Sequence, residues 1–266
     1  MATKDTKPAA QPAPSTEVAA PSRTAVTMPM SWKDRMKAVA VKTAEAEAPQ
    51  GGFISFKSGR MSIGDTLVPG DKIECIIVDY LFHNKYYNVP YNAKNPVPPV
   101  CYAFSREELD LEPAEGAEEP QAESCAECPQ NVWGSAGNGS KGKACTNSRR
   151  LWLLAADALN DPSKISKLDF FQCDLPVTSI KNFSRFVGEL PPGMPPFAFV
   201  VEMSVKPHET SLFQVHFKPM EEIKNEAALE QLAARNWKNE QEPLPKYPTK
   251  EEMAERASGG TGSTKY

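Results

Sequence analysis

Three closely spaced cysteines in the middle of the chain restrict its structure more than any other feature. Cys125 and Cys128 form a Cys-x2-Cys pair, and Cys145 follows 17 residues after Cys128. This spacing is typical of a zinc knuckle, in which thiolates hold a short loop around a tetrahedral metal ion. The surrounding segment is polar, so burial in a core gives no reason for three cysteines there. The pattern therefore predicts a zinc loop.

A tetrahedral site needs a fourth ligand, for which Cys101 is the first candidate and His83 and His216 are alternatives. The predicted ligand set is Cys101, Cys125, Cys128 and Cys145. Four thiolates leave no open position for water, so this Zn²⁺ would be structural rather than catalytic. Cys75 and Cys173 lie in apolar strand patterns and are expected in the core.

The distribution of apolar residues predicts one folded domain between two disordered ends. Both ends are rich in Pro, Ala, Ser, Thr or Gly, and such segments bury too little apolar surface to offset the entropy of ordering. The predicted divisions are a disordered arm over 1–50 with a short helix at 32–46, a β-barrel domain over 51–220 with a zinc-loop insertion at 105–149, a helix over 221–240, and a disordered tail over 241–266.

The sequence of this domain predicts a mainly β fold. Runs rich in β-branched and aromatic residues predict strands, and Pro/Gly clusters between them predict turns. The expected strands are 53–56, 73–82, 100–104, 150–156, 167–172, 197–205 and 212–217, with one internal helix within 176–190. Short, mostly antiparallel strands at this density favour a small barrel or sandwich. An OB-like barrel with an inserted metal loop fits well, and other small barrels fit too.

No part of the sequence reaches the roughly 18–20 consecutive apolar residues of a membrane span, and the first residues lack the apolar core of a signal peptide. A cytoplasmic protein with no membrane role is therefore expected. In that compartment six cysteines are metal ligands or thiols rather than disulfides.

The net charge of −4 conceals an uneven distribution of charge. Residues 53–220 hold 16 basic and 20 acidic side chains, and nine of the acids lie in the segment 107–127, which has no basic residue. Without that segment the domain carries +5. A mildly basic body with an acidic, solvated loop favours a polyanionic partner.

Cations and aromatic rings cluster around the cysteines. The candidate phosphate contacts are Lys141, Lys143, Arg149 and Arg150, and the candidate base-stacking rings are Tyr86, Tyr87, Tyr91 and Trp133. Trp152 lies in an apolar strand pattern and is expected in the core. Stacking on aromatic faces tolerates any base, so this combination predicts sequence-independent binding of a single strand.

Other functions stay open at this level. The three histidines stand in no nucleophile–base arrangement, so the sequence predicts a protein that is not an enzyme. A zinc-stabilised protein-interaction module, using the acidic loop and the arms as contact surfaces, is the main alternative. A nuclease or recombinase subunit completed by another chain is a third. None of these sequence patterns indicates an oligomeric state.

Two strings carry a resemblance to a known family. They are Cys125-x-x-Cys128-Pro-x-Asn131-x-Trp133-Gly-Ser and Lys141-Gly-Lys-Ala-Cys145-x-Asn147-x-Arg149-Arg150-Leu. They resemble a family of tailed-phage proteins that are mostly uncharacterised or described as single-stranded DNA-binding replication proteins. The resemblance extends over about 53–219 and includes the Leu-Pro-x-Thr-Ser helix start at 175–179.

This resemblance implies an OB-like barrel that coats single-stranded DNA during phage replication or recombination in the cytoplasm of the infected host. It implies zinc ligation by Cys125, Cys128 and Cys145, with Cys101 as the fourth ligand, and it suggests phage replication or recombination proteins as partners. One departure concerns the end of the sequence. Single-strand binding proteins commonly end in an acidic tip that recruits partners, whereas this sequence ends Gly-Gly-Thr-Gly-Ser-Thr-Lys-Tyr.

Overall fold

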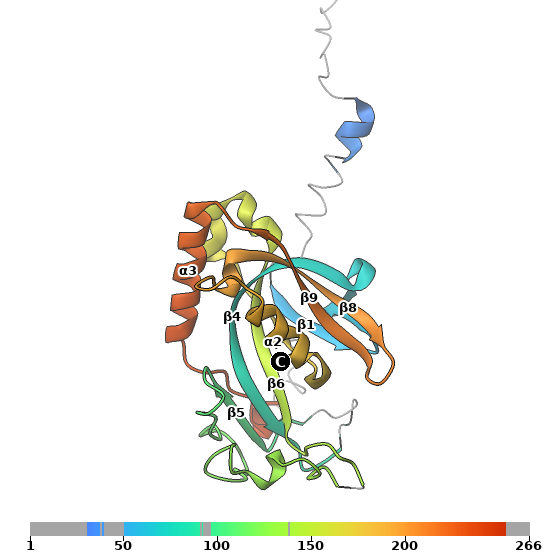
Figure 1. Ribbon diagram of the computed structural model, residues 1–266, viewed down its shortest axis with the longest axis vertical. Helices are drawn as coiled ribbons and strands as arrows, with labels where there is room; N and C mark the ends of the chain where they lie inside the picture. The colour runs from blue at the N-terminus through green and yellow to red at the C-terminus, as the bar shows by residue number, and fades with distance from the viewer. Residues whose placement is uncertain are drawn as a thin grey trace, which may run out of the picture. The chain divides into compact units, whose positions relative to one another are not determined.

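The computed structural model describes residues 31–37, 39, 51–90, 92, 97–137 and 139–253 (Figure 1). The chain divides into two compact units, Met1–Ala48 and Pro49–Tyr266. In the first unit, residues 32–37 are helical. Ser31 caps them, because its Oγ accepts the Asp34 backbone N–H at 3.3 Å and donates to Asp34 Oδ2 at 2.8 Å. Most of the predicted arm over 1–50, and most of the 32–46 helix, lie outside the described residues.

The second unit is built on one curled, mixed β-sheet. Its strands are β1 (Gly52–Lys57), β2 (Arg60–Ile63), β3 (Thr66–Leu67), β4 (Lys72–Tyr86), β5 (Cys101–Ser105), β6 (Thr146–Ala155), β7 (Phe171–Asp174), β8 (Phe199–His208) and β9 (Leu212–Glu222). They run in the order β3-β2-β1-β7-β6-β4-β8-β9, and β5 also pairs with β4. The domain is therefore mainly β, and the sheet forms a half-barrel.

β4 organises the sheet because its 15 residues pair with three strands. Its first residues pair with β8, its last residues pair with β5, and β6 runs along its other edge. The register with β6 shifts between Ile77 and Asp79, and such an irregularity bends and twists a strand. β4 thus belongs both to the main core and to the end of the sheet that carries the cysteine loop.

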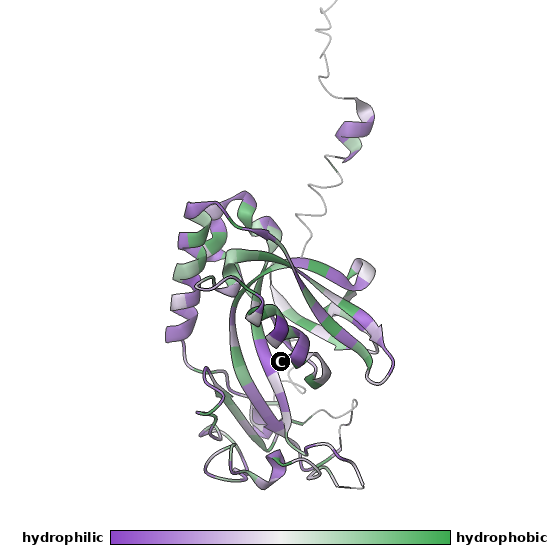
Figure 2. Ribbon diagram, viewed as in Figure 1, coloured by the Kyte–Doolittle hydropathy of each residue, from purple (hydrophilic) through white to green (hydrophobic). Residues whose placement is uncertain are grey.

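The β1–β2 side and the β8–β9 side of the sheet pack on the same hydrophobic core. Ile54 of β1, Met61 of β2, Met203 of β8 and Val215 of β9 are all buried in one hydrophobic cluster. The helix α2 (Ile180–Gly188) contributes its buried aromatic residues to the same cluster. Figure 2 shows that β6 is hydrophobic in the half within this core and hydrophilic in the half nearer the cysteine loop. The curled sheet and α2 together enclose the core.

Several sequence expectations are corrected in detail. β1 runs parallel to β7, with Gly52 opposite Phe171, so the sheet is not wholly antiparallel. The short strands β2 and β3 were not expected. The strand expected at 167–172 is displaced, because residues up to Lys167 form a 3-10 turn and β7 begins at Phe171. This parallel pairing joins residues more than a hundred positions apart, which local patterns do not encode.

Both expected helices of the domain are present. α2 lies within the expected 176–190 and stops just ahead of Pro191 and Pro192, whose rings cannot continue a helix. The last helix, α3 (Glu226–Gln241), starts five residues later than the expected 221. Asn225 caps it by accepting the Ala228 N–H on its side chain at 3.2 Å. β9 instead continues to Glu222.

The acidic segment is not a free, solvated loop. Leu111 is buried, Ala114 donates its N–H to Tyr102 O at 2.8 Å, and Glu119 donates to Val100 O at 2.7 Å. These bonds hold the segment against β5, while its charged side chains stay largely at the surface.

The tail beyond 241 is partly ordered. Tyr247 packs against the ring of Tyr102 at a centroid separation of 5.0 Å, and its OH lies 3.2 Å from His83 Nε2. The expectation of a disordered tail therefore fails for this residue, and residues 254–266 lie outside the described part. Of the helices that the structure describes, none is long and apolar enough to cross a membrane.

Candidate metal centre and nucleic-acid interface

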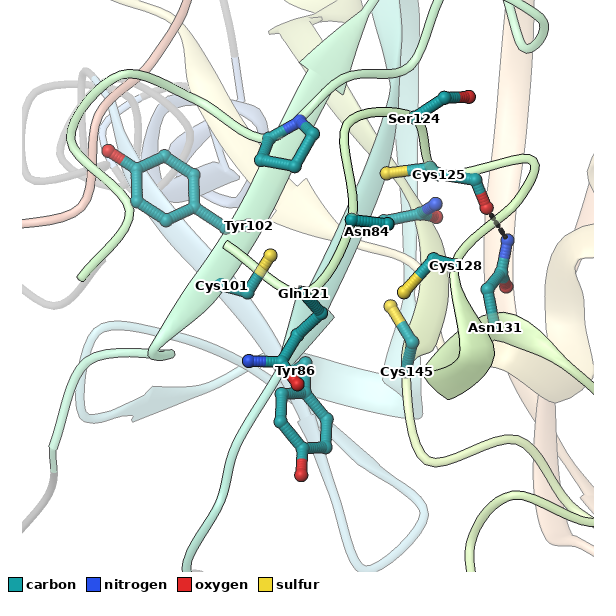
Figure 3. A pocket seen from close by; sticks show the side chains of 12 residues that line it. Asn84, Tyr86, Cys101, Tyr102, Gln121, Ser124, Cys125, Cys128, Asn131 and Cys145 are labelled. Carbon is teal, nitrogen blue, oxygen red and sulfur yellow. Dashed lines mark hydrogen bonds between the residues drawn. The ribbon is translucent and has the colours of Figure 1, made fainter. Parts of the chain in front are cut away.

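Strand pairing brings the four predicted zinc ligands to one pocket. Cys101 begins β5 and lies opposite Tyr86 of β4, while Cys145 directly precedes β6, whose Thr146 lies opposite Lys85. β5 and β6 flank β4 on opposite edges, so the two cysteines stand on either side of its end. The loop between β5 and β6 adds Cys125 and Cys128. All four are buried and line the same pocket, as Figure 3 shows.

Backbone hydrogen bonds fix the loop that carries these cysteines. The N–H of Cys125 donates to Leu111 O at 2.9 Å, and the N–H of Cys145 donates to Gln130 O at 2.8 Å. Asn131 donates its N–H to Cys128 O at 3.0 Å and its side-chain amide to Cys125 O at 2.8 Å. The last of these bonds is the dashed line in Figure 3. The two arms of the loop are thus tied together on both sides of the Cys-x2-Cys pair.

Burial is the main influence on the ionisation of these thiols, and their mutual charges add to it. Burial raises the pKa of the Cys145 thiol to about 12, and the charges of Cys125, Cys128 and Cys101 add to the rise. Burial also raises the pKa of Cys101 and Cys125, and nearby thiolate charge raises both further. Raised pKa values keep these thiols protonated, so any metal bound by them has to displace their protons.

Hydrogen bonds from neighbouring residues stabilise the thiolate form of Cys101, Cys125 and Cys145. The backbone N–H of Gln121 hydrogen-bonds to Cys101, that of Lys85 to Cys145, and the Asn84 side chain to Cys125, and each bond lowers the pKa of the thiol it meets. Such outer contacts are what orient metal ligands in known sites.

The four cysteines are of a residue type that binds Zn²⁺, and they line one pocket. Among the residues that the structure describes, however, no group of three or more His, Cys, Asp or Glu side chains is placed so that it could hold a metal ion. The two alternative ligands are placed elsewhere. His83 lies beside Asp174 and Tyr247, and His216 lies on β9. Cys75 and Cys173 are fully within the core, as expected.

Two of the four predicted phosphate contacts are corrected. Arg149 is buried, and its guanidinium lies 3.8 Å from the centroid of the Phe82 ring. Arg150 is also buried, and its Nε donates to Asp174 Oδ1 at 2.8 Å. Both side chains belong to the strand β6 and point into the fold, so neither is a surface cation that a DNA backbone can reach.

The remaining cations stand beside an exposed indole. The side chain of Trp133 is 74% exposed, and Lys143 Nζ lies 5.5 Å from the centroid of its ring. Lys143 is held in place because its Nζ donates to Asn131 Oδ1 at 3.1 Å and to Asn147 Oδ1 at 3.0 Å. Lys141 is exposed nearby in sequence. This group of Trp133, Lys141 and Lys143 is called the loop face below.

Of the three predicted stacking tyrosines, the structure describes Tyr86 and Tyr87. Tyr86 is half-buried and lines the cysteine pocket, so it supports the site rather than offering an open ring. Tyr87 is exposed at the end of β4. Tyr91 lies outside the described residues. Trp152 is buried, as expected.

A network of asparagines links the loop face to the sheet. Besides holding Lys143, Asn147 donates its side-chain amide to Asn131 Oδ1 at 3.0 Å and to Asn84 Oδ1 at 2.6 Å. The sequence patterns gave these asparagines no role. Asn131 and Asn147 stand three and two residues after Cys128 and Cys145, and this proximity to the cysteines is the only local signal for them.

A second buried polar cluster lies behind the pocket, around Asp174. Its carboxylate accepts hydrogen bonds from Arg150 Nε and Nη2 and from Lys85 Nζ, the last at 3.0 Å. It also faces His83 Nδ1 at 3.4 Å. Burial alone would raise the pKa of Asp174, but His83, Arg150 and Lys85 outweigh it and hold this pKa well below the usual range. Burial lowers the pKa of His83 to about 4. The sequence contains no local sign of this cluster.

Comparisons with known proteins supply no relative from which a role could be carried over: no family model, no curated protein and no solved structure matches the chain.

Proposed function

We propose that this protein binds single-stranded DNA without strong sequence preference and is not an enzyme. In this proposal the half-barrel is an OB-like barrel that coats DNA during phage replication or recombination in the host cytoplasm. The observation that carries it is the loop face, where a largely exposed indole stands beside a positioned lysine on a loop fixed by backbone hydrogen bonds. Aromatic faces and cations together are what sequence-tolerant single-strand binding requires.

The proposed zinc ion would act on the loop and not on the DNA. Cys101, Cys125, Cys128 and Cys145 would hold it, and a Zn²⁺ with four thiolates supplies folding energy and no open coordination position. The loop between Cys128 and Cys145 carries Trp133, Lys141 and Lys143. A metal that fixes both ends of this loop would reduce the entropy lost when the loop face binds a strand.

The chemistry of the loop face suits a flexible strand better than a duplex. An unpaired base can stack on Trp133, while Lys141 and Lys143 neutralise neighbouring phosphates. Stacking contributes about 1–3 kcal/mol per base. In a duplex the base faces are already stacked, so only the phosphate contacts would remain.

Fluorescence anisotropy with labelled oligo-dT and its duplex, over a salt series, tests the proposal. We expect preferential single-strand binding whose log affinity falls linearly with log salt. Trp133→Ala should weaken binding by about 1–3 kcal/mol, the contribution of one stacked base. Trp237→Ala is the matched control, because Trp237 is 65% exposed on α3 and lies outside the loop face. Equal binding by wild type and Trp133→Ala would overturn the proposal.

One observation favours a second candidate, a zinc-stabilised module that docks a phage or host replication protein. Val132 and Trp133 are adjacent and both exposed, and such an apolar pair also suits a protein partner. The salt series separates the two candidates. Binding to a protein through this pair would depend weakly on salt, and oligo-dT would not bind.

A further inference from the structure

The hairpin of β8 and β9 carries a polar surface that is separate from the loop face. Its register places Lys206 opposite Gln214, Ser204 opposite His216, and Glu202 opposite Lys218. Residues of the alternate positions, such as Met203 and Val215, are buried in the main core. Because successive side chains of a strand point to opposite sides, the polar set points away from that core.

The helix α2 adds an arginine to this face. Asn182 of α2 donates its side-chain amide to Gln214 Oε1 at 3.2 Å and to Val215 O at 3.0 Å, which anchors the helix beside β9. Arg185 follows Asn182 by three residues and so lies on the same side of the helix. Figure 1 shows α2 beside β9, and Figure 2 shows hydrophilic residues on the visible side of α2.

His216 lies close enough to three basic side chains for their charges to act on it. Partial burial lowers the pKa of His216, and the charges of Lys206, Arg185 and His208 lower it further. The group of Arg185, Lys206, His208 and His216 is called the hairpin patch below.

The cations of the hairpin patch lack acidic partners. Arg185 and Lys206 are exposed, and among the described residues neither forms a salt bridge. The acid on the same face, Glu202, is already paired with Lys72 at 3.2 Å. Exposed like charges repel one another, so a cluster of this kind is stabilised when a polyanion covers it.

We propose that the hairpin patch is a second contact for the phosphate backbone of single-stranded DNA, distinct from the loop face. This inference rests on the proposed function and extends it. The patch offers charge without an open aromatic ring, so it would neutralise phosphates while the loop face stacks a base. The strand would leave the loop face and follow the domain to the β8–β9 hairpin.

The test compares two double variants with wild type in the full-length protein. Arg185→Ala/Lys206→Ala removes two patch cations, and Lys164→Ala/Lys167→Ala removes two exposed lysines from the 3-10 turn at Pro162–Lys167. The probe is oligo-dT of about 16 nucleotides, the upper end of the site size of one OB fold. Each single-strand phosphate contact contributes about 0.7 to the salt slope, so the patch variant should lose about 1.4 and the control nothing.

His216 supplies an independent readout by NMR. Phosphates beside His216 favour its imidazolium form, so oligo-dT should raise the pKa of His216 in wild type. The His216 resonance is assigned as the one that is lost from the spectrum of the His216→Gln variant. The patch would be overturned if Arg185→Ala/Lys206→Ala kept the affinity and salt slope of wild type and oligo-dT left the His216 titration unchanged. If Trp133→Ala still bound more weakly in that case, the proposed function would remain intact. Absence of any binding by wild type would overturn both. Urea midpoints equal to wild type confirm that each variant folds.

Discussion

At the scale of single residues, Asp174 has an importance that its sequence context does not suggest. It is the shared acceptor for Arg150 and Lys85, and Arg150 is almost wholly buried. The two cations and the carboxylate stabilise one another only as a set, because a buried charge without its partner retains the full cost of desolvation.

Asp174→Asn should therefore destabilise the protein by about 3–5 kcal/mol, the usual cost of breaking a buried ion pair. Urea unfolding measures this as a lower midpoint with an unchanged slope. Asp161→Asn is the control, since Asp161 pairs with Lys164 at the surface and its loss should have no measurable effect. If Asp174→Asn matched that control, the cluster would contribute nothing to stability.

At the scale of elements, the β5–β6 loop depends on contacts of a different kind from those of the sheet. Few large apolar side chains of this loop are buried, and it is held mainly by hydrogen bonds, while its three cysteines line one pocket with Cys101. The sheet instead has a continuous hydrophobic core. Loss of a metal should therefore loosen the loop before it affects the sheet.

We expect the purified protein to hold one Zn²⁺ per chain and Cys145→Ser to lose it. Limited proteolysis should then cut the variant, or the chelated wild type, between β5 and β6 while the sheet remains intact. Cys75→Ala is the control, because Cys75 is buried in the core away from the pocket, so this variant should be less stable yet keep its zinc. Elemental analysis that finds no zinc in wild type would contradict the proposed metal site.

At the scale of the whole molecule, pairing along β4 sets the order of local stability. β4 and β6 pair over ten positions in the middle of the sheet, whereas β2 and β3 form a short edge in which both β3 residues are exposed. Backbone groups in the middle open only when much of the fold opens with them.

Hydrogen–deuterium exchange with peptide resolution should thus be slowest for β4 and β6 and fastest for β2 and β3. Peptides of β8 and β9 should be intermediate, because β9 pairs on one side only. Fast exchange in the middle of β4 would show that the half-barrel is not one cooperative unit.

Local patterns in the sequence were sufficient for much of the fold. The β-branched and aromatic runs located β1, β4, β5, β6, β8 and β9 to within a few residues, because alternation and turn chemistry are local properties. The prolines after α2 placed its end for the same reason. The cysteine spacing likewise indicated Cys125, Cys128 and Cys145, which line one pocket together with Cys101, the first candidate for a fourth ligand.

What the sequence by itself determined was the type of the long strands and helices and the cysteines that line one pocket. Only the tertiary structure decided which charges are free. Arg149 and Arg150 look like Lys141 and Lys143 in the sequence, yet β6 carries both arginines into the fold, where Arg150 meets Asp174 24 positions later. His83 meets Tyr247 across 164 positions. Such pairings depend on how distant strands and segments come together, and no local period records that.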